Sequence, residues 1–199
     1  YTRFTRLDNG LLETSNLYVT MFDWHLNSGD SVHSLFDANV TYERLFEAFE
    51  ISKGVMLPAG EYRFTPWRIM FMTADKRRLH GRIGFDFGNF WSGTAKVIET
   101  ALTYKLPPRF SISLNTNQTF ANLPQGDFIA RIVSSQINYS VSPFLSFSNL
   151  IQFDNRSENL GLQSRVRWTI EPGNEIFFVF GQGWVQDMER GYSFRRQDS

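Results

Sequence analysis

Apolar and polar residues alternate with a period of two along most of the chain, and this pattern limits its fold more than any other feature. In the segment that begins at Phe110, Ile112 and Leu114 continue one face, while Ser111 and Ser113 take the other. Successive side chains point to opposite faces of a β-strand, whereas a helix needs a period near 3.6. The chain is therefore predicted to be all-β.

About ten antiparallel strands in an up-and-down meander account for the pattern. They are expected near residues 14–26, 32–42, 62–74, 79–88, 95–105, 110–117, 133–141, 144–154, 160–170 and 174–184. Only the stretch 42–51 has spacing that also suits a short helix. A chain of 199 residues has the length of one domain. We expect a single β-barrel domain over 1–199, truncated at both ends, because Tyr1 falls within a strand pattern and the polar residues 195–199 lead into no further strand.

The connections between these strands alternate in length. Short ones, rich in Pro and Gly that preset turn geometry, fall at 27–30, 75–78, 106–109, 142–143 and 171–174. Longer ones fall at 46–61, 88–95, 118–127, 154–159 and 185–199. Tight turns at one end and long loops at the other are typical of outer-membrane barrels, whereas sandwiches use Greek-key crossings. The sequence thus favours part of an outer-membrane-type β-barrel, and a soluble antiparallel sheet is the alternative.

The composition removes several classes of protein. Twenty Lys and Arg balance twenty Asp and Glu, which argues against a sequence-independent nucleic-acid binder. The absence of cysteine excludes disulfide scaffolds and thiolate metal sites. No apolar run of about 18 residues occurs, so a membrane-spanning helix is excluded, while membrane-spanning strands are only half apolar and remain open.

Large aromatic residues lie near the ends of predicted strands. A tyrosine or tryptophan at such a position can sit half in lipid with its polar tip in water, as in the aromatic girdles of membrane proteins. The residues are Tyr42, Trp67, Tyr104, Tyr139 and Trp168.

The polar face carries five charged candidates for the interior of a barrel: Arg82, Asp86, Glu99, Arg165 and Arg167. Arg165 and Arg167 share a face about 7 Å apart along one strand. Facing lipid at the bilayer midplane, each would cost roughly 2–4 kcal/mol, so both are predicted to face the lumen or its rim. Two roles remain open: pairing with Asp86 or Glu99 in a packed interior, or forming an anion-attracting ring in a pore.

Motifs for enzyme chemistry are missing. His25, His33 and His80 form no His-x-x-x-His or His-Glu-x-x-His pattern, so they are interpreted as strand-surface or lumen residues without a metal. There is no Gly-x-Ser-x-Gly elbow and no nucleotide-binding glycine loop. Residues 154–158 lack the spacing of a calcium loop and are interpreted as a solvated turn. No catalytic, cofactor-binding or metal residue is assigned, and no cofactor is expected.

Several short motifs resemble one bacterial family in their order and spacing. They are Gly60–Arg63, Leu123–Phe128, Val141–Phe144, the Arg-x-Arg-Trp and Pro-Gly stretch Leu162–Gly173, and Ile176–Trp184. They are similar to the C-terminal barrel region of the outer-membrane family catalogued as domain of unknown function 5916. The similarity runs from about Glu61 to Phe194, and the stretch Leu162–Gly173 is its most specific part.

This resemblance implies a place in the outer membrane of a Gram-negative bacterium, but no reaction and no catalytic residues. Family members usually carry an upstream domain similar to carbohydrate-binding modules of family nine, and they end in one more amphipathic strand, which this chain lacks. The implied partners are outer-membrane lipid and, through the upstream domain, a glycan; no nucleic acid is implied. The expected function is a non-enzymatic barrel that serves as anchor, channel or uptake component. A barrel enzyme that hydrolyses lipid or glycan is the alternative, and a soluble β-protein with a ligand-filled interior is the third.

Overall fold

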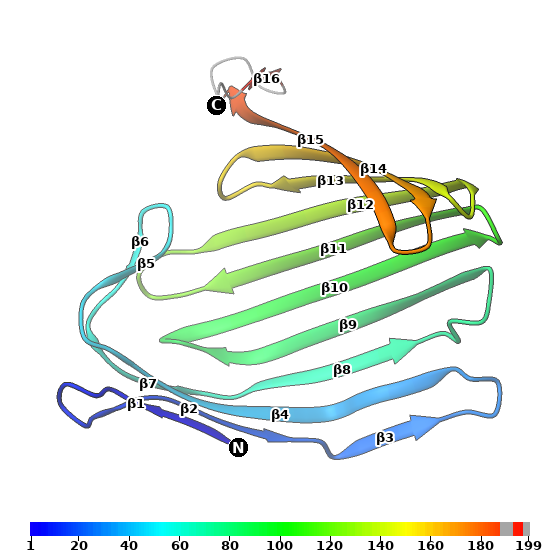
Figure 1. Ribbon diagram of the computed structural model, residues 1–199. Helices are drawn as coiled ribbons and strands as arrows, with labels where there is room; N and C mark the ends of the chain where they lie inside the picture. The colour runs from blue at the N-terminus through cyan, green and yellow to red at the C-terminus, as the bar shows by residue number, and fades with distance from the viewer. Residues whose placement is uncertain (188–192, 197–199) are drawn as a thin grey trace. The chain divides into compact units, whose positions relative to one another are not determined.

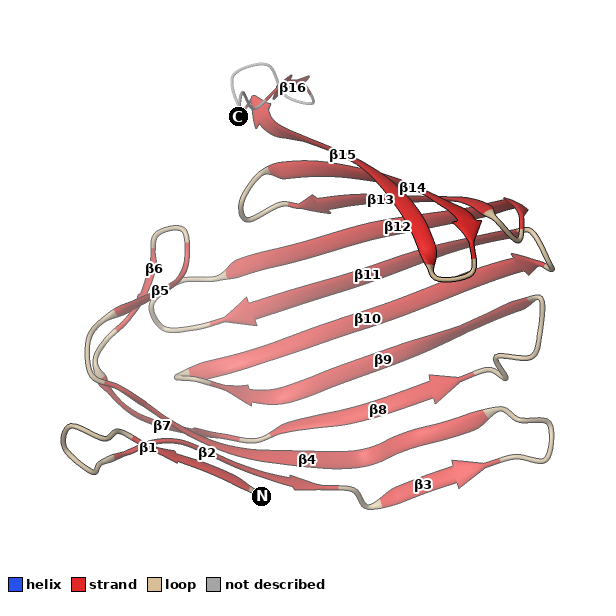
Figure 2. Cartoon of the chain, viewed as in Figure 1, coloured by secondary structure: helices blue, strands red, loops and turns tan. Residues whose placement is uncertain are grey.

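The computed structural model describes residues 1–187 and 193–196, except for the side chains at 34–36, 187, 193 and 196. Strands make up 75% of the chain, and the described residues contain no helix (Figure 2). Neighbouring strands pair antiparallel, as β4 and β14 do with their neighbours. The predicted all-β antiparallel meander is therefore confirmed. Within the described residues no helix has the length and apolar character needed to cross a bilayer.

The strands follow one another along the chain in a simple order (Figure 1). The first eight are β1 (Thr2–Thr5), β2 (Leu12–Val19), β3 (Phe22–His25), β4 (Ser31–Leu45), β5 (Phe49–Ser52), β6 (Val55–Leu57), β7 (Gly60–Phe64) and β8 (Pro66–Met72). The next eight are β9 (Leu79–Phe90), β10 (Gly93–Leu106), β11 (Phe110–Asn122), β12 (Phe128–Ser142), β13 (Leu145–Asp154), β14 (Asn159–Glu171), β15 (Asn174–Asp187) and β16 (Ser193–Arg196).

Hydrogen bonds join these strands in the order β1-β2-β4-β8-β9-β10-β11-β12-β13-β14-β15-β16, with β3 and β7 also paired to β4 and with β5-β6 as a separate hairpin. The described chain forms two compact units. Unit 1 comprises 1–73, 82–99 and 118–130, and unit 2 comprises 74–81, 100–117 and 131–199.

The first third of the chain differs most from the sequence prediction. The strand expected over 14–26 is two strands, because the chain breaks at Thr20 and Met21 before pairing again with β4. The long loop expected over 46–61 contains the β5-β6 hairpin and the start of β7. The stretch 42–51 is strand and turn, since its apolar residues pair in the sheet or pack beneath the hairpin.

The expected contrast between short and long connections is only partly present. The connection predicted at 88–95 is wrong: β9 ends at Phe90 and β10 begins at Gly93, which leaves a two-residue turn. Its glycines resemble loop residues, but a Cβ at Gly93 would collide with the backbone carbonyl of Asn122, so glycine serves close strand packing here. The connections at 123–127 and 155–158 are also shorter than expected. The connection 185–199 lies partly outside the described residues.

Few apolar side chains are buried in the described chain, and half of them are alanines. They are Ala38, Ile51, Val55, Leu57, Ala74, Ala95, Ala121 and Leu123. The one packed cluster lies in unit 1, where Ile51, Val55 and Leu57 of the β5-β6 hairpin meet Leu123. Leu57 is 0% exposed. Within the described residues, the large sheet has no comparable cluster of buried apolar side chains.

Strand pairing sorts the side chains of each unit into two faces. In unit 1, β8 and β9 place Ile69 opposite Phe85 on one face and Arg68 opposite Asp86 on the other. In unit 2, β14 places Val166 between Phe147 and Phe178, and the adjacent Arg165 lies opposite Ser148. Directly paired residues share a face, so the alternation of β8 matches that of β9, and the alternation of β13 matches that of β14. We call the two sides the apolar face and the polar face of each unit. β15 is apolar from Ile176 to Phe180 and places Phe177 and Val179 on the polar face.

Candidate functional site

The polar face of unit 1 is organised around Arg68. Its guanidinium donates from Nε and Nη2 to the two carboxylate oxygens of Asp86, at 2.7 and 2.6 Å. The same Nη2 lies 3.5 Å from a carboxylate oxygen of Glu99. Two-pronged arginine–carboxylate contacts of this kind are short, strong and geometrically specific. Arg68 thus holds two acidic side chains from β9 and β10 on one face of the sheet.

A third carboxylate, Asp37, lies beside this group. It is 1% exposed, and strand pairing places it directly opposite Arg68. Its oxygens accept hydrogen bonds from the Tyr18 hydroxyl at 3.2 Å, the Thr20 hydroxyl at 3.4 Å and the backbone N–H of Met21 at 3.1 Å. A buried carboxylate needs such donors, because burial without them is costly. The three carboxylates and Arg68 together form what we call the Arg68 cluster.

The structure places the predicted residues of this face as follows. Asp86 and Glu99 lie in the Arg68 cluster, and Arg82 is an exposed residue on the same face of β9, opposite Met72. Sequence analysis did not select Arg68, which is the cation that binds both carboxylates. A signal was present, because Arg68 is the charged member of the alternating segment Trp67-Arg68-Ile69.

Arg165 and Arg167 lie on the polar face of unit 2. Arg165 stands opposite Ser148 and Val179, and Arg167 stands opposite Ser146 and Phe177. The carboxylate nearest to Arg167 is that of Glu175, at 4.0 Å from Nη1. Asp86 and Glu99, which were predicted to pair with these arginines, instead form ion pairs with Arg68 in unit 1.

Beside Arg165, small polar side chains continue across the polar face of unit 2. The Ser148 hydroxyl donates to Asn138 Oδ1 at 2.8 Å, and Asn138 Nδ2 donates to the Ser111 hydroxyl at 3.3 Å. Gln136 Nε2 also donates to Asn138 Oδ1, at 3.3 Å. This face is therefore hydrogen-bonded from β11 to β13.

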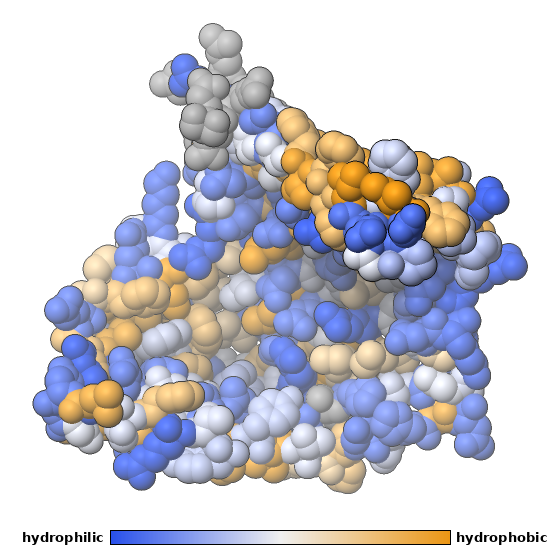
Figure 3. Space-filling view, viewed as in Figure 1, coloured by the Kyte–Doolittle hydropathy of each residue, from blue (hydrophilic) through white to orange (hydrophobic). Residues whose placement is uncertain are grey.

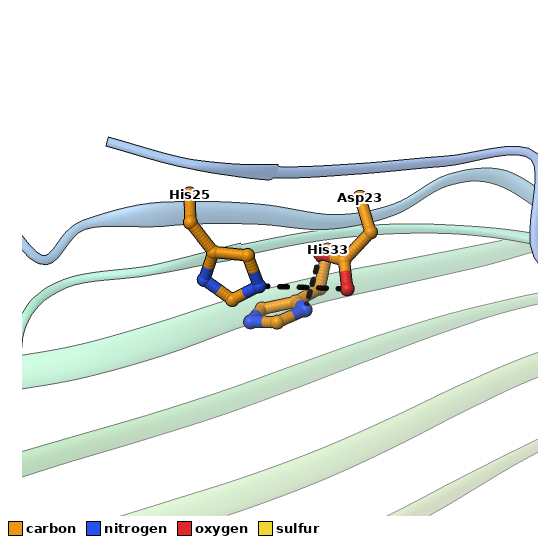
Figure 4. A group of neighbouring side chains, drawn as sticks. All are labelled: Asp23, His25 and His33. Carbon is orange, nitrogen blue, oxygen red and sulfur yellow. Dashed lines mark ion pairs between the residues drawn. The ribbon is translucent and has the colours of Figure 1, made fainter. Parts of the chain in front are cut away.

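A second group of chemically capable side chains lies on the β3-β4 hairpin of unit 1 (Figure 4). Asp23 and His25 are two residues apart on β3 and share a face, and His33 comes from β4. His33 Nδ1 lies 2.7 Å from one oxygen of Asp23, and His25 Nε2 lies 3.6 Å from the other. The two imidazole rings meet edge to face, with centroids 4.8 Å apart. We call this group the His-Asp trio.

The sequence carried a signal for the trio that a search for helical spacings misses. The hairpin pairs Trp24 with Val32 and His25 with Ser31, its register shifts between Phe22 and Trp24, and the side chains of Asp23 and His33 meet across it. The turn is fixed by a hydrogen bond from the Leu26 N–H to the Asp30 carbonyl, 2.8 Å long. An Asp-x-His segment, a tight turn and a histidine at the facing position were therefore readable as one cluster.

The third histidine lies elsewhere and has a simpler environment. His80 Nε2 lies 3.7 Å from a carboxylate oxygen of Asp75, and its Nδ1 lies 3.2 Å from the backbone carbonyl of Arg77. This is one imidazole with one carboxylate at the β8-β9 connection. It provides an internal reference for the trio, where two imidazoles share one carboxylate.

Each unit of the described chain has an open cavity. One, of about 500 Å³, lies in unit 1 between β9, β10 and β11 and is lined by residues that include Phe87, Lys96 and Phe120. The other, of about 310 Å³, lies in unit 2 at the β13-β14 hairpin and includes Gln152 and Asp154. Asp154 accepts hydrogen bonds from the Arg156 N–H and the Ser157 hydroxyl, so its carboxylate closes the turn.

Comparison of the chain with protein-family models, with curated proteins and with solved structures finds no match in any of the three.

Proposed function

We propose that this chain forms the strand wall of an outer-membrane-type β-barrel, with its apolar face toward lipid and its polar face toward the interior. The barrel acts without catalysis, as an anchor or uptake component for a carbohydrate-binding-like domain of the same protein. The location and the associated domain come from the resemblance to the family of domain of unknown function 5916. The orientation of the two faces is supported by the exposure of apolar side chains, the length of the apolar stretches and the pairing of polar groups.

The observation that carries the proposal is the large amount of exposed apolar surface on strands that bury almost none. Exposed residues include Phe71 (49%), Ile83 (51%), Leu114 (45%), Trp168 (49%) and Phe178 (60%). Figure 3 shows apolar side chains gathered on the surface over the β14-β15 hairpin. Water-soluble monomers rarely expose such continuous apolar areas, so this surface needs another apolar medium against it.

The apolar stretches have the length that a bilayer requires. Along β14 the apolar face runs from Leu160 to Ile170, which is about 33 Å at about 3.3 Å per residue. A strand tilted by about 40° converts this length to about 25 Å along the bilayer normal, the height of the apolar band of outer-membrane barrels. Tyr139 and Trp168 are exposed near the same ends of their strands, where an aromatic girdle would lie.

Polar groups on the two faces also suit this arrangement. On the apolar face of unit 2, the Ser164 hydroxyl donates to Asn149 Oδ1 at 2.7 Å, so these two side chains satisfy each other. Lipid offers no hydrogen-bond partner, and mutual pairing of this kind is what it demands. On the polar face, Arg68 is ion-paired with Asp86 and Glu99 within the protein. A lumen with paired charges suits a packed or narrow interior better than an ion-selective pore.

Two adjacent substitutions on β11 test the orientation of the faces. Leu114 is exposed on the apolar face, and Ser113 lies on the polar face with Ser111, the partner of Asn138. In lipid vesicles, Leu114→Arg is expected to lower the free energy of unfolding by on the order of 2 kcal/mol, because an arginine is placed against lipid. Ser113→Arg, one residue away and with the same added charge, should change it by less than about 0.5 kcal/mol. Denaturant titration of the vesicle-folded protein measures both values.

The same two variants would behave differently in a water-soluble protein. In a water-soluble sheet, arginine at a leucine that is already 45% exposed belongs to the class of mild surface substitutions. If both variants fold in aqueous buffer without detergent and have the same stability, the membrane proposal is wrong.

The non-enzymatic role is tested on the whole protein in outer-membrane vesicles. Glycan binding should disappear when the carbohydrate-binding-like domain is deleted, because the barrel only anchors or feeds that domain. Phospholipid, ester and glycan substrates should not turn over, either with that domain or without it. Turnover that survives the deletion and is lost in a variant of a polar-face Ser, His or Asp would establish the alternative, a barrel hydrolase.

A further inference from the structure

We propose that the His-Asp trio is a binding site for one divalent transition-metal ion of the zinc type. The proposal concerns Asp23, His25 and His33 only, and it does not rest on a membrane location. The β3-β4 hairpin is closed by its own strand pairing and by its own turn, so the site is complete within this short segment.

The positions of the donor atoms support this assignment. One ligand atom from each of the three residues can be chosen so that all lie within 4.8 Å of one another. Around a tetrahedral zinc ion with bonds near 2.0–2.1 Å, neighbouring ligand atoms are about 3.3 Å apart. Side-chain rotations that move the ligand atoms by about 1 Å would bring the three atoms to that spacing. Figure 4 shows both rings turned toward the Asp23 carboxylate.

The chemistry of the donors selects the class of ion. Imidazole nitrogens suit zinc, copper, nickel and iron, whereas calcium and magnesium prefer an all-oxygen set. Two histidines and one carboxylate provide three ligands and leave a fourth position for water or another ligand. The side chains of His25 and Asp23 are 67% and 43% exposed, so an ion can reach them from solution.

An ordinary ion pair explains only part of the geometry. The 2.7 Å contact between His33 and Asp23 is a complete hydrogen bond in itself. His25 adds a second imidazole at 3.6 Å from the same carboxylate and edge to face with the first ring. One divalent ion would bind both imidazoles in neutral form together with the carboxylate. By contrast, His80 and Asp75 form a simple pair of one imidazole and one carboxylate.

A bound ion would act on the edge of the sheet. β3 has four residues, and within the part of the chain that the structure describes it pairs with β4. Ligands from both strands would tie β3 to β4 across the hairpin. The open coordination position would lie on the polar face, to which Asp23, His25 and His33 belong.

Titration of the metal-free protein with Zn²⁺, in the medium in which it folds, tests the site. Calorimetry should show one ion per chain, and Co²⁺ should give the visible absorption bands of a low-coordinate nitrogen–oxygen site. His25→Gln, His33→Gln and Asp23→Asn should each weaken Zn²⁺ binding by more than about tenfold. His80→Gln is the matched control and should leave the affinity unchanged. An excess of Ca²⁺ should not displace the ion.

Folding is checked for each variant by circular dichroism. His25→Gln decides the matter if His33→Gln fails to fold, because the His25 side chain is largely exposed and its loss removes little packing. The proposal is wrong if the wild-type chain binds no Zn²⁺ at micromolar concentration. It is equally wrong if His80→Gln weakens binding as much as the trio variants do, or if all variants bind like the wild type.

Discussion

Replacing Arg68 by methionine is expected to destabilise the protein by about 2–3 kcal/mol. The substitution keeps most of the side-chain volume but leaves Asp86 and Glu99 without their cation, next to the buried Asp37. Breaking a fully buried ion pair costs about 3–5 kcal/mol. A lower value is expected here because the side chains of Arg68, Asp86 and Glu99 are still 30%, 18% and 29% exposed.

Denaturant unfolding of the wild type and the variant measures this difference. Arg82→Met is the matched control, because Arg82 is an exposed arginine on the same face of the adjacent strand, and its loss should cost less than about 0.5 kcal/mol. In the double variant Arg68→Met with Asp86→Asn, part of the stability should return, since one uncompensated carboxylate has been removed. Equal effects of Arg68→Met and Arg82→Met would show that the cluster does not stabilise the fold.

Truncation of Leu57 to alanine is expected to destabilise the β5-β6 hairpin by about 2–5 kcal/mol. Leu57 is 0% exposed and packs with Ile51, Val55 and Leu123, so its removal leaves a cavity in the one packed cluster of the described chain. Hydrogen exchange at the amides of 49–57 measures the effect as the free energy of local opening.

Met56→Ala provides the control for this prediction. Met56 is the adjacent residue on the same strand and is 46% exposed, so its truncation should change local opening by less than about 0.5 kcal/mol. Unchanged exchange in the Leu57→Ala variant would mean that the cluster does not hold the hairpin to the turn at Leu123.

The strands that could be predicted from the sequence are those whose alternation continues without interruption. The predicted segment 79–88 corresponds to β9 and 160–170 to β14, because one face of each is mostly apolar. The β5-β6 hairpin could not be predicted in this way. Its strands have four and three residues, too few to establish a period, and they are held by contact with Leu123, which is distant in the sequence.

The candidate sites could also be predicted only in part from the sequence. Alternation placed Asp86 on the polar face of β9, but it could not identify Arg68 as its partner, because that requires the register between β8 and β9. The three histidines were predicted to bind no metal because they do not fit the metal-binding motifs, which have helical spacing. On strands, ligands occur two residues apart and across a hairpin, as Asp23, His25 and His33 do.

The packed cluster beneath the β5-β6 hairpin also has a consequence for the order of folding. Most strands pair with a neighbour in sequence, so these hairpins close short loops and can form quickly. The contact between Leu57 and Leu123 closes a much longer loop and must await synthesis of the strands between them. Until that moment the apolar side of residues 49–57 lacks its contact with Leu123. While the chain is incomplete, the apolar side of this segment is therefore only partly covered.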